Sequence, residues 1–246
     1  MSYLLYCIFR STPQPGARVF PEFQRQPVFV VSQDQLSAGI SELPEPESTP
    51  CIPDLLAYEK VIEFFYREQT VLPLQFGCQV GEISEALARL AERQSEYLSL
   101  LARLEGMGEM GIHLLFEAGD ATVGDPAGSQ PPDARRSSAS SGTAYLAARR
   151  EIFLNREQQV VRQRRLADTL CESLCGFFVR RKMKMADSAG SPLLSLYFLV
   201  RKESIDDFRQ AASRFQPAAP VKLLQSGPWP PFNFVDFLNR GSSSRI

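Results

Sequence analysis

Several residue types that support common chemistries are scarce in this chain of 246 residues. It has one histidine, His113, and one tryptophan, Trp229. A single imidazole excludes a multi-histidine metal site and a second imidazole base. The sequence also lacks Gly-x-Gly-x-x-Gly and Walker A motifs, the common phosphate-binding loops. We therefore expect no enzyme activity, no cofactor and no metal site.

Long apolar runs and an excess of one charge are also absent. The chain has 27 Lys and Arg against 28 Asp and Glu, a formal net charge of −1, so no general attraction to nucleic acid or anionic membrane follows. No apolar run approaches the roughly 20 residues that span a bilayer. The start, Met1 to Arg10, lacks a basic region before an apolar one and a cleavage site. We expect a cytoplasmic protein without membrane insertion.

Disulfide bonds are not expected either, because the five cysteines form an odd and scattered set that suits buried thiols in a reducing compartment. Two of them, Cys171 and Cys175, are one helical turn apart and could contact one zinc ion. Nothing nearby supplies two more ligands, so core thiols are the simpler interpretation.

A change of composition divides the chain. Residues 118–142 are rich in Gly, Pro, Ser and Asp and offer almost nothing to bury, which predicts a flexible linker. It separates residues 1–117 from residues 143–246, each near the usual size of a domain. We expect two α+β domains.

The N-terminal region has the pattern of an α+β sandwich. Apolar periodicity predicts strands over residues 3–9, 27–32, 35–43, 70–76 and 107–116, and helices from Pro53 and from about Glu82 to Gly106. The order is roughly β-β-β-α-β-α-β, which predicts an α+β sandwich of the ferredoxin-like kind. The strand over residues 70–76 contains Pro73, so it should be an edge strand. Its apolar residues Leu72, Leu74 and Phe76 are our candidates for binding a partner there.

The C-terminal region predicts a long helix and a small antiparallel sheet. The helix runs from about Thr143 to Leu174, followed by a hairpin over residues 176–186 and 192–201, a helix from Ser204 and a last strand over residues 220–225. The segment Gly227-Pro228-Trp229-Pro230-Pro231-Phe232-Asn233-Phe234 follows. Its prolines stiffen an extended arm, and two interpretations remain open: Trp229, Phe232 and Phe234 clamp the two domains together, or they dock a partner.

Four segments resemble the gas vesicle protein F/L family (GvpF/GvpL): Tyr3-Leu4-Leu5-Tyr6-Cys7, Thr70-Val71-Leu72-Pro73-Leu74-Gln75-Phe76-Gly77, Gly142-Thr143-Ala144-Tyr145-Leu146 and the terminal Gly-Pro-Trp-Pro-Pro-Phe-Asn-Phe-Val. The resemblance covers nearly the whole chain apart from the linker. Two departures are Phe232, where a tyrosine is common, and a long insertion between Arg10 and Val28.

The resemblance implies two domains, the first a modified ferredoxin-like fold, and a role in building gas vesicles. It implies an assembly factor or minor structural component that binds the main gas vesicle shell protein, a small and very hydrophobic subunit, and other accessory proteins are further possible partners. It implies a location at the gas vesicle and no catalytic activity.

An alternative is a nucleic-acid-binding or regulatory module that uses the basic residues of the C-terminal region. These lie on the long helix and on the strand from Arg180 to Lys184: Arg149, Arg150, Arg156, Arg162, Arg164, Arg165, Arg180, Arg181, Lys182 and Lys184. RNA-binding ferredoxin-like domains place aromatic stacking platforms among such charges. Only Phe177 and Phe178 are available at the start of this strand, so we expect no nucleic acid partner.

Overall fold

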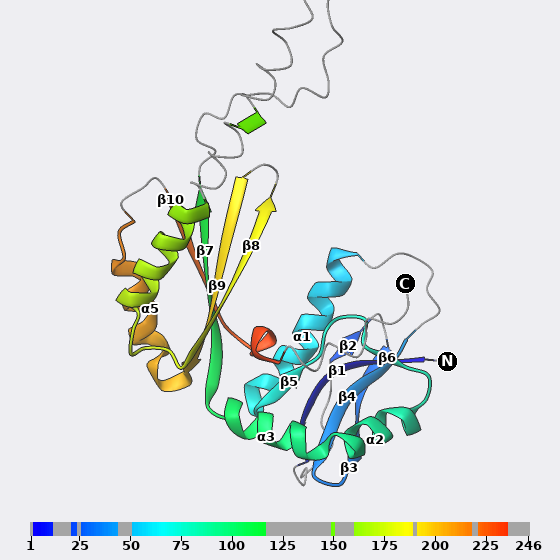
Figure 1. The fold of residues 1–246 in the computed structure, drawn as a ribbon. Coiled ribbons are helices and arrows are strands. Elements are labelled where there is room, and N and C mark those ends of the chain that lie inside the picture. Colours follow the sequence, from blue (N-terminus) through cyan, green and yellow to red (C-terminus); the bar gives the residue numbers. More distant parts are fainter. Residues whose placement is uncertain are drawn as a thin grey trace, which may run out of the picture.

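The chain folds into two antiparallel sheets that carry helices on their faces (Figure 1). The structure is a computed structural model that describes residues 2–11, 21–23, 26–43, 51–116, 149–150, 160–188, 191–217 and 221–235. The α+β class expected from the sequence is confirmed. The predicted linker, residues 118–142, lies outside the described residues, as does most of the predicted helix before residue 160.

The first sheet has the strand order β2-β3-β4-β1-β5, with β6 also paired to β1. Its strands are β1 (Ser2–Arg10), β2 (Glu22–Phe23), β3 (Gln26–Gln33), β4 (Leu36–Leu43), β5 (Val71–Pro73) and β6 (Gln79–Val80). The central strand β1 is buried continuously from Leu4 to Phe9, because helices cover both faces of the sheet. A strand covered on both sides has an unbroken apolar run instead of an alternating one.

Helix α1 (Ile52–Glu68) covers one face of this sheet. It begins at Cys51, whose backbone N–H donates a hydrogen bond of 2.9 Å to the Asp54 carboxylate. Its buried stripe packs against β1: Tyr58, Val61, Ile62, Phe65 and Tyr66. The opposite stripe of α1 therefore faces away from the sheet.

Helices α2 (Ile83–Glu92) and α3 (Gln94–Leu104) cover the other face. The sequence predicted one continuous helix here, and that expectation was wrong at Arg93, whose φ of −113° and ψ of 24° are not helical. The break lets α2 pack along β3 and β4 while α3 packs along β1 and β5, so the two helices follow the twist of the sheet.

The insertion between Arg10 and Val28 contributes β2. Phe23 of this strand is fully buried in the core beneath α1, with its ring centroid 5.8 Å from that of Tyr6. The insertion therefore extends the first sheet and its core.

The second sheet has the order β10-β7-β9-β8, with all pairs antiparallel. Its strands are β7 (Met107–Phe116), β8 (Arg180–Ser188), β9 (Ser191–Arg201) and β10 (Val221–Trp229). A helix over residues 160–173 lies between β7 and β8, and α5 (Ile205–Arg214) lies between β9 and β10. This is the β-α-β-β-α-β order of a ferredoxin-like fold.

Because of the pairing of β7, the ferredoxin-like order of strands and helices is found in the second sheet. We expected that order in the N-terminal region with Met107–Phe116 as its last strand, but β7 pairs with β9 and β10 instead of with β1. Its 10 residues, which fell within the expected domain 1–117, therefore belong to the second sheet. The remaining domain limits stay predictions.

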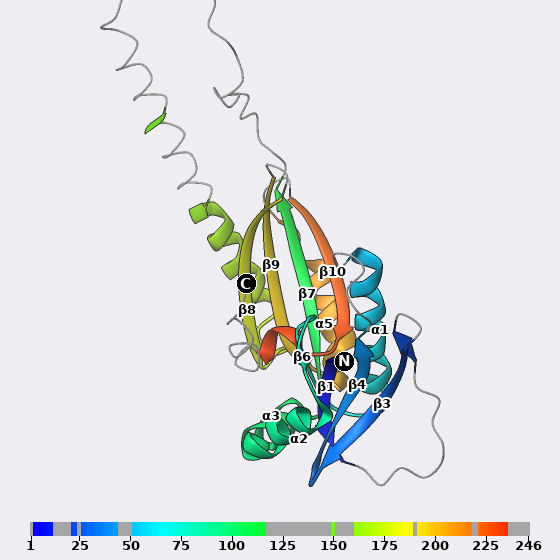
Figure 2. The ribbon, with the colours of Figure 1, turned by 90° about the vertical axis from the view of Figure 1, so that its right-hand side faces the viewer.

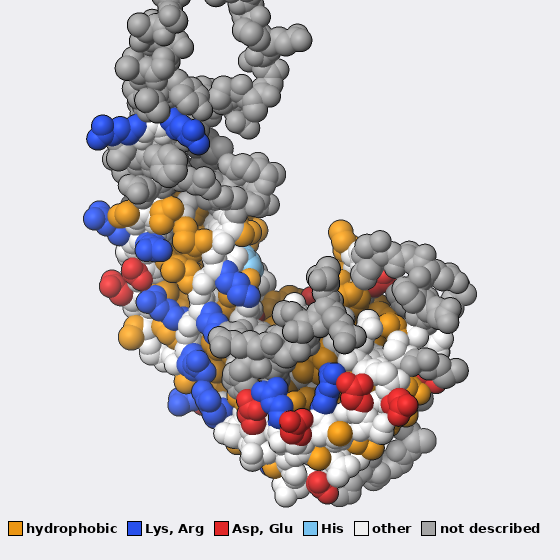
Figure 3. All heavy atoms as spheres, turned by 45° about the vertical axis from the view of Figure 1, so that its right-hand side comes forward, with side chains coloured by type: hydrophobic (Ala, Val, Ile, Leu, Met, Phe, Trp, Pro, Cys, Tyr) orange, Lys and Arg blue, Asp and Glu red, His pale blue; other side chains and the backbone are white. Residues whose placement is uncertain are grey.

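The two faces of the second sheet differ. The helix over residues 160–173 and α5 cover one face, where Met110, Ile112 and Leu114 of β7 enter a core. In Figure 2 the strands β8, β9, β7 and β10 stand side by side in this sheet, with α2 and α3 at its foot. The other face of the sheet looks towards α1, and the surface between them is hollowed (Figure 3).

Candidate functional site

The proline-rich arm, residues 227–234, begins inside β10. Trp229 pairs with Glu109 of β7, after a register shift that follows Ser226. Gly227 permits this path because its φ is +101°, and a Cβ there would lie 2.5 Å from the carbonyl oxygen of Glu109. Arg209 of α5 donates a hydrogen bond of 2.8 Å to the carbonyl oxygen of Gly227. The start of the arm is therefore fixed to the second sheet.

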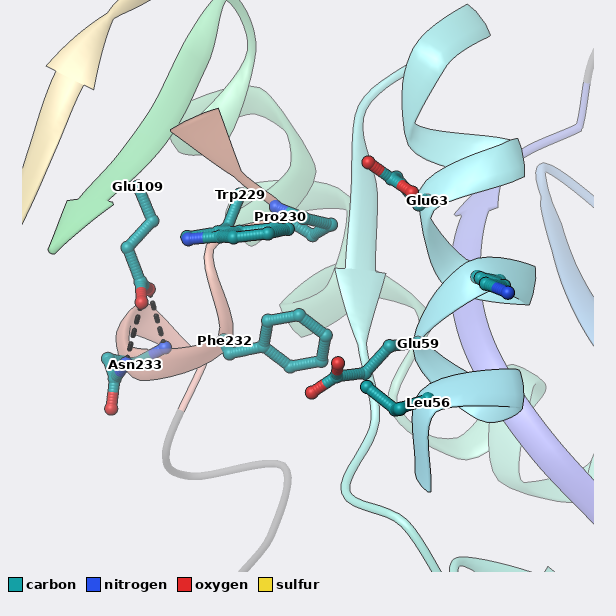
Figure 4. Close-up of a pocket in the computed structure, with 9 residues that line it drawn as sticks. Leu56, Glu59, Glu63, Glu109, Trp229, Pro230, Phe232 and Asn233 are labelled. Carbon is teal, nitrogen blue, oxygen red and sulfur yellow. Dashed lines mark hydrogen bonds between the residues drawn. The ribbon is translucent and has the colours of Figure 1, made fainter. Parts of the chain in front are cut away.

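Glu109 fixes the end of the arm. The short 3-10 helix Phe232–Phe234 places Asn233 against this carboxylate, which accepts hydrogen bonds from the Asn233 backbone N–H at 2.7 Å and side-chain Nδ2 at 2.6 Å (Figure 4). Glu109 is only 3% exposed. Burial raises its pKa above the usual value, against the opposing effects of Asn233, Lys184 and Lys182.

The last residues of the arm enter the first sheet's cores. Phe234 is 4% exposed and packs with Val235 in the core beneath α2 and α3, while Phe232 packs against the core beneath α1. Lys182 of the second sheet lies over the Phe234 ring, with Nζ 5.8 Å from the ring centroid. The arm thus connects the two sheets physically.

Tyr66 of α1 makes a second connection. Its hydroxyl donates a hydrogen bond of 2.9 Å to the carbonyl oxygen of Met107, and Lys202 Nζ lies 4.4 Å from its ring centroid. Burial, with the nearby Glu109 carboxylate, raises the pKa of Tyr66 to about 12. The phenol therefore stays protonated near neutral pH and keeps its donor role.

A groove of about 440 Å³ lies between α1 and the arm, and we call it the α1–arm groove (Figure 4). The α1 wall consists of Leu56, Glu59, Lys60 and Glu63. The opposite wall consists of Trp229, Pro230, Phe232 and Asn233, with Glu109 behind them. Because both the arm and α1 are anchored to the sheets, the walls are held in place without a ligand.

Large apolar side chains are exposed at this groove. Of the lining residues, Trp229 is 44% exposed and Leu56 is 52% exposed. Ile52 is not part of the lining but lies one helical turn before Leu56 on α1 and is 75% exposed. The indole N–H of Trp229 has no hydrogen-bond partner among the described residues. A tryptophan of this kind offers apolar area and one polar donor to whatever covers it.

Carboxylates line the same groove. In Figure 4 the Glu59 side chain extends towards Phe232, and that of Glu63 points towards the arm. Glu63 is 3.5 Å from Arg67, but both side chains are exposed, so this pair contributes little. Lys60 is the one basic residue in the lining, and the third carboxylate, Glu109, is bound by Asn233 on the side of the arm away from α1. The groove is apolar in its walls and acidic at its rim.

The predicted edge residues do not lie at this groove. Strand β5 is the last strand in the order of the first sheet, as predicted, but Leu72 and Leu74 are buried in its core, at 0% and 6% exposure. Phe76 is half-buried, and its ring packs edge-on against that of Tyr58 at 5.1 Å. The side chains of Leu72 and Leu74 are therefore not available to a partner.

The predicted clamp residues have different roles. Phe234 is buried. Phe232 is half-buried on the side of the arm that faces α1, and Trp229 lines the groove and stays exposed. Phe234 is thus buried where a clamp would act and Trp229 is left exposed, and both the clamp and the docking interpretations stay predictions.

The basic strand makes internal contacts in the structure. Arg181 is 3.4 Å from the Asp168 carboxylate, and Lys184 Nζ lies 5.5 Å from the ring centroid of Tyr197. Phe177 and Phe178, the aromatic residues that a nucleic-acid site would need, pack against the core of the second sheet. The nucleic-acid alternative is not favoured by this arrangement.

The histidine and the possible metal ligands singled out from the sequence show no arrangement for catalysis or metal binding among the described residues. His113 Nδ1 is 2.9 Å from the Ser195 hydroxyl, and burial lowers its pKa. In the described ranges, no three His, Cys, Asp or Glu residues are grouped so as to hold a metal ion. Within the same residues, no helix is long and apolar enough to cross a membrane.

Sequence reasoning missed most of the groove. In the alternating pattern of residues 107–116, Glu109 falls on the face opposite Met110 and Ile112, as it does in the structure, but the sequence gives no sign that the arm buries it there. A signal did exist on α1, where Ile52, Leu55 and Leu56 widen the apolar stripe beyond what one buried face needs.

Comparisons with known proteins agree with this fold. The family model described as gas vesicle synthesis protein GvpL/GvpF matches residues 2–236. Gas vesicle protein F of Streptomyces sp. (strain CB03234) is 27% identical over 213 residues, which cover 86% of this chain and 89% of that protein.

Two solved structures share the architecture. The crystal structure of the gas vesicle protein GvpF from Anabaena sp. PCC7120 has a TM-score of 0.71 at 16% identity, covering 95% of both chains. That of GvpF from Microcystis aeruginosa has a TM-score of 0.68 at 17% identity, covering 95% of this chain and 98% of the other. These likenesses establish the fold, and the family model covers nearly the whole chain. The chain belongs to the GvpL/GvpF family of gas vesicle synthesis proteins.

Proposed function

We propose that this protein serves in gas vesicle assembly by binding the main, hydrophobic shell subunit, either as a low-copy component of the vesicle or as a chaperone-like factor. Family membership supports the process. The observation that carries the binding role is the set of large apolar side chains that α1 and the arm leave exposed around one groove.

Exposed apolar groups of this kind suit a hydrophobic partner. Clustered apolar side chains at a concave surface with a polar rim commonly mark protein interaction sites. The two sheets are tied together by Glu109–Asn233, Tyr66–Met107 and the burial of Phe234, so the groove does not have to be ordered when a partner binds. A preorganised surface loses less free energy on binding than one that must fold first.

The test is co-expression with the main shell subunit of the same host, followed by affinity purification of this chain. We expect the shell subunit to co-purify, and deletion of this chain's gene to reduce flotation of the cells. As a control, the same shell subunit is co-expressed with an unrelated tagged protein. This control measures how much shell subunit is retained by non-specific binding. The proposal is wrong if the shell subunit is not retained and cells lacking this chain float normally.

A further inference from the structure

The α1–arm groove has two unlike walls, and this asymmetry restricts what can occupy it. On one side the exposed Trp229 and the half-buried Phe232 present apolar ring surface, and the buried Pro230 lies beside them. On the other side Leu56 is followed along α1 by Glu59 and Glu63. An occupant must satisfy both walls at once.

We propose that the α1–arm groove binds a segment of the shell subunit in which a bulky apolar residue is followed at close spacing by lysine or arginine. This rests on the proposed function and adds the site and the chemistry of the segment. The apolar residue lies between Leu56 and Trp229, and the basic residue pairs with Glu59 and Glu63.

The charges on the α1 wall of the groove favour a cation, because Glu59 and Glu63 outnumber the one basic residue there, Lys60. In the described part of the chain, Glu59 has no ion-pair partner, and the one ion-pair partner of Glu63 is the exposed Arg67. Both carboxylates lie beside apolar surface, where an added cation would be partly shielded from water. Charge complementarity of this kind selects partners and fixes the register of a bound segment.

The dimensions fit a short segment. From Ile52 to Glu63 the exposed stripe of α1 is about 16 Å long at 1.5 Å per residue. The volume of about 440 Å³ falls within the range of roughly 300–1,000 Å³ typical of binding pockets. A helix of two to three turns, or an extended segment of similar length, can lie along this stripe with one or two side chains in the groove.

Trp229 makes the proposal measurable, because it is the only tryptophan of the chain and forms one wall of the groove. The probes are tryptophan-free synthetic peptides that tile the main shell subunit, titrated into the full-length protein. We expect the peptides that carry the apolar–basic pattern to shift the Trp229 emission to shorter wavelength, and their affinity to fall as NaCl is raised.

Two variants test the two walls. Leu56→Asp and the double variant Glu59→Gln/Glu63→Gln should each weaken binding by about tenfold or more, as the loss of a central contact does. The double variant should also flatten the dependence on NaCl, which a merely structural role would not do. Matched controls are Met183→Asp, a similarly exposed apolar residue on β8 at 46% exposure, and Glu92→Gln on α2, and both should bind as the original chain does.

The outcomes separate the two proposals. If the shell subunit co-purifies but Leu56→Asp and the double variant retain it fully and no peptide shifts Trp229, the groove is not the site and the proposed function stands. If small amphiphiles shift Trp229 but no peptide does, the groove proposal is also wrong. If the original chain retains no shell subunit and cells lacking this chain float normally, both proposals are wrong.

Discussion

The Glu109 carboxylate holds Asn233 by two hydrogen bonds, at 2.7 Å from the backbone N–H and at 2.6 Å from the side-chain amide. The two residues are 124 positions apart in sequence. Glu109 belongs to the second sheet, and Phe234, the neighbour of Asn233, is buried against the first. This contact therefore sets the position of the arm between the two sheets and of the groove that the arm lines.

Removing the amide should destabilise the protein. In Asn233→Ala the Glu109 carboxylate keeps only the backbone donor, and a buried polar atom left without a partner costs about 1–3 kcal/mol. Urea unfolding measures this loss. Gln225→Ala, on an exposed position of β10, is the control and should change the free energy of unfolding by no more than about 0.5 kcal/mol. Equal effects of the two variants would contradict a special role for the Glu109–Asn233 contact.

The same carboxylate predicts a pH dependence. Burial raises the pKa of Glu109 in the folded protein, so the folded state binds this proton more tightly than the unfolded state does. The resulting stability is complete below the ordinary pKa of about 4.5 and is lost as pH rises through the folded value.

Comparison with Glu109→Gln isolates this effect, because glutamine does not titrate. The free energy of unfolding of the original chain minus that of the variant should increase as the pH is lowered from 7 towards 4. Urea unfolding at a series of pH values gives this difference. A difference that is flat, or that falls towards low pH, would show that Glu109 does not bind its proton more tightly in the folded protein.

Gly227 should tolerate substitution less well than another glycine with a positive φ. Gly227→Ala imposes both a left-handed conformation and a collision with the Glu109 carbonyl oxygen, whereas a Cβ added to Gly77, at φ +89°, would meet no atom within 4 Å. We expect Gly77→Ala to lower the free energy of unfolding by about 1–2 kcal/mol. Gly227→Ala should lower it by clearly more. Thermal unfolding of both variants checks this order, and equal losses would mean that the arm moves away from β7 without cost.

The local sequence pattern predicted most of the strands and helices. It did not predict which strands pair with one another. Alternation over Met107–Phe116 correctly predicted a strand, yet nothing in its residues distinguishes pairing with β1 from pairing with β9 and β10. The register shift at Tyr6 places Tyr6 and Cys7 in the same core, which strict alternation of faces does not predict. Long-range pairing of this kind depends on the whole set of contacts.

The candidate site was less predictable for the same reason. Leu72 and Leu74 satisfy the pattern of an exposed edge, but α2 and α3 cover them. The burial of Glu109 and the exposure of Trp229 both depend on where the arm lies, which is determined by contacts more than 100 residues apart. Composition identified the arm as unusual but could not assign its residues to the core or to the groove.

The arm also predicts that two aromatic residues five positions apart differ strongly in their contribution to stability. One of the two interpretations of the sequence has Trp229 clamp the two domains together, and under it Trp229→Ala would lower stability. In the structure Trp229 is 44% exposed and Phe234 is 4% exposed. Phe234→Ala should therefore cost about 3–5 kcal/mol, because it leaves a cavity in the core beneath α2 and α3.

Trp229→Ala should instead cost less than about 1 kcal/mol, as surface substitutions usually do. Urea unfolding followed by circular dichroism measures both variants without relying on tryptophan emission. Small-angle scattering of the two variants then reports the arrangement of the sheets, which Phe234→Ala should loosen and Trp229→Ala should leave unchanged. If Trp229→Ala proves the more destabilising of the two, Trp229 clamps the sheets together and is not free to take part in binding.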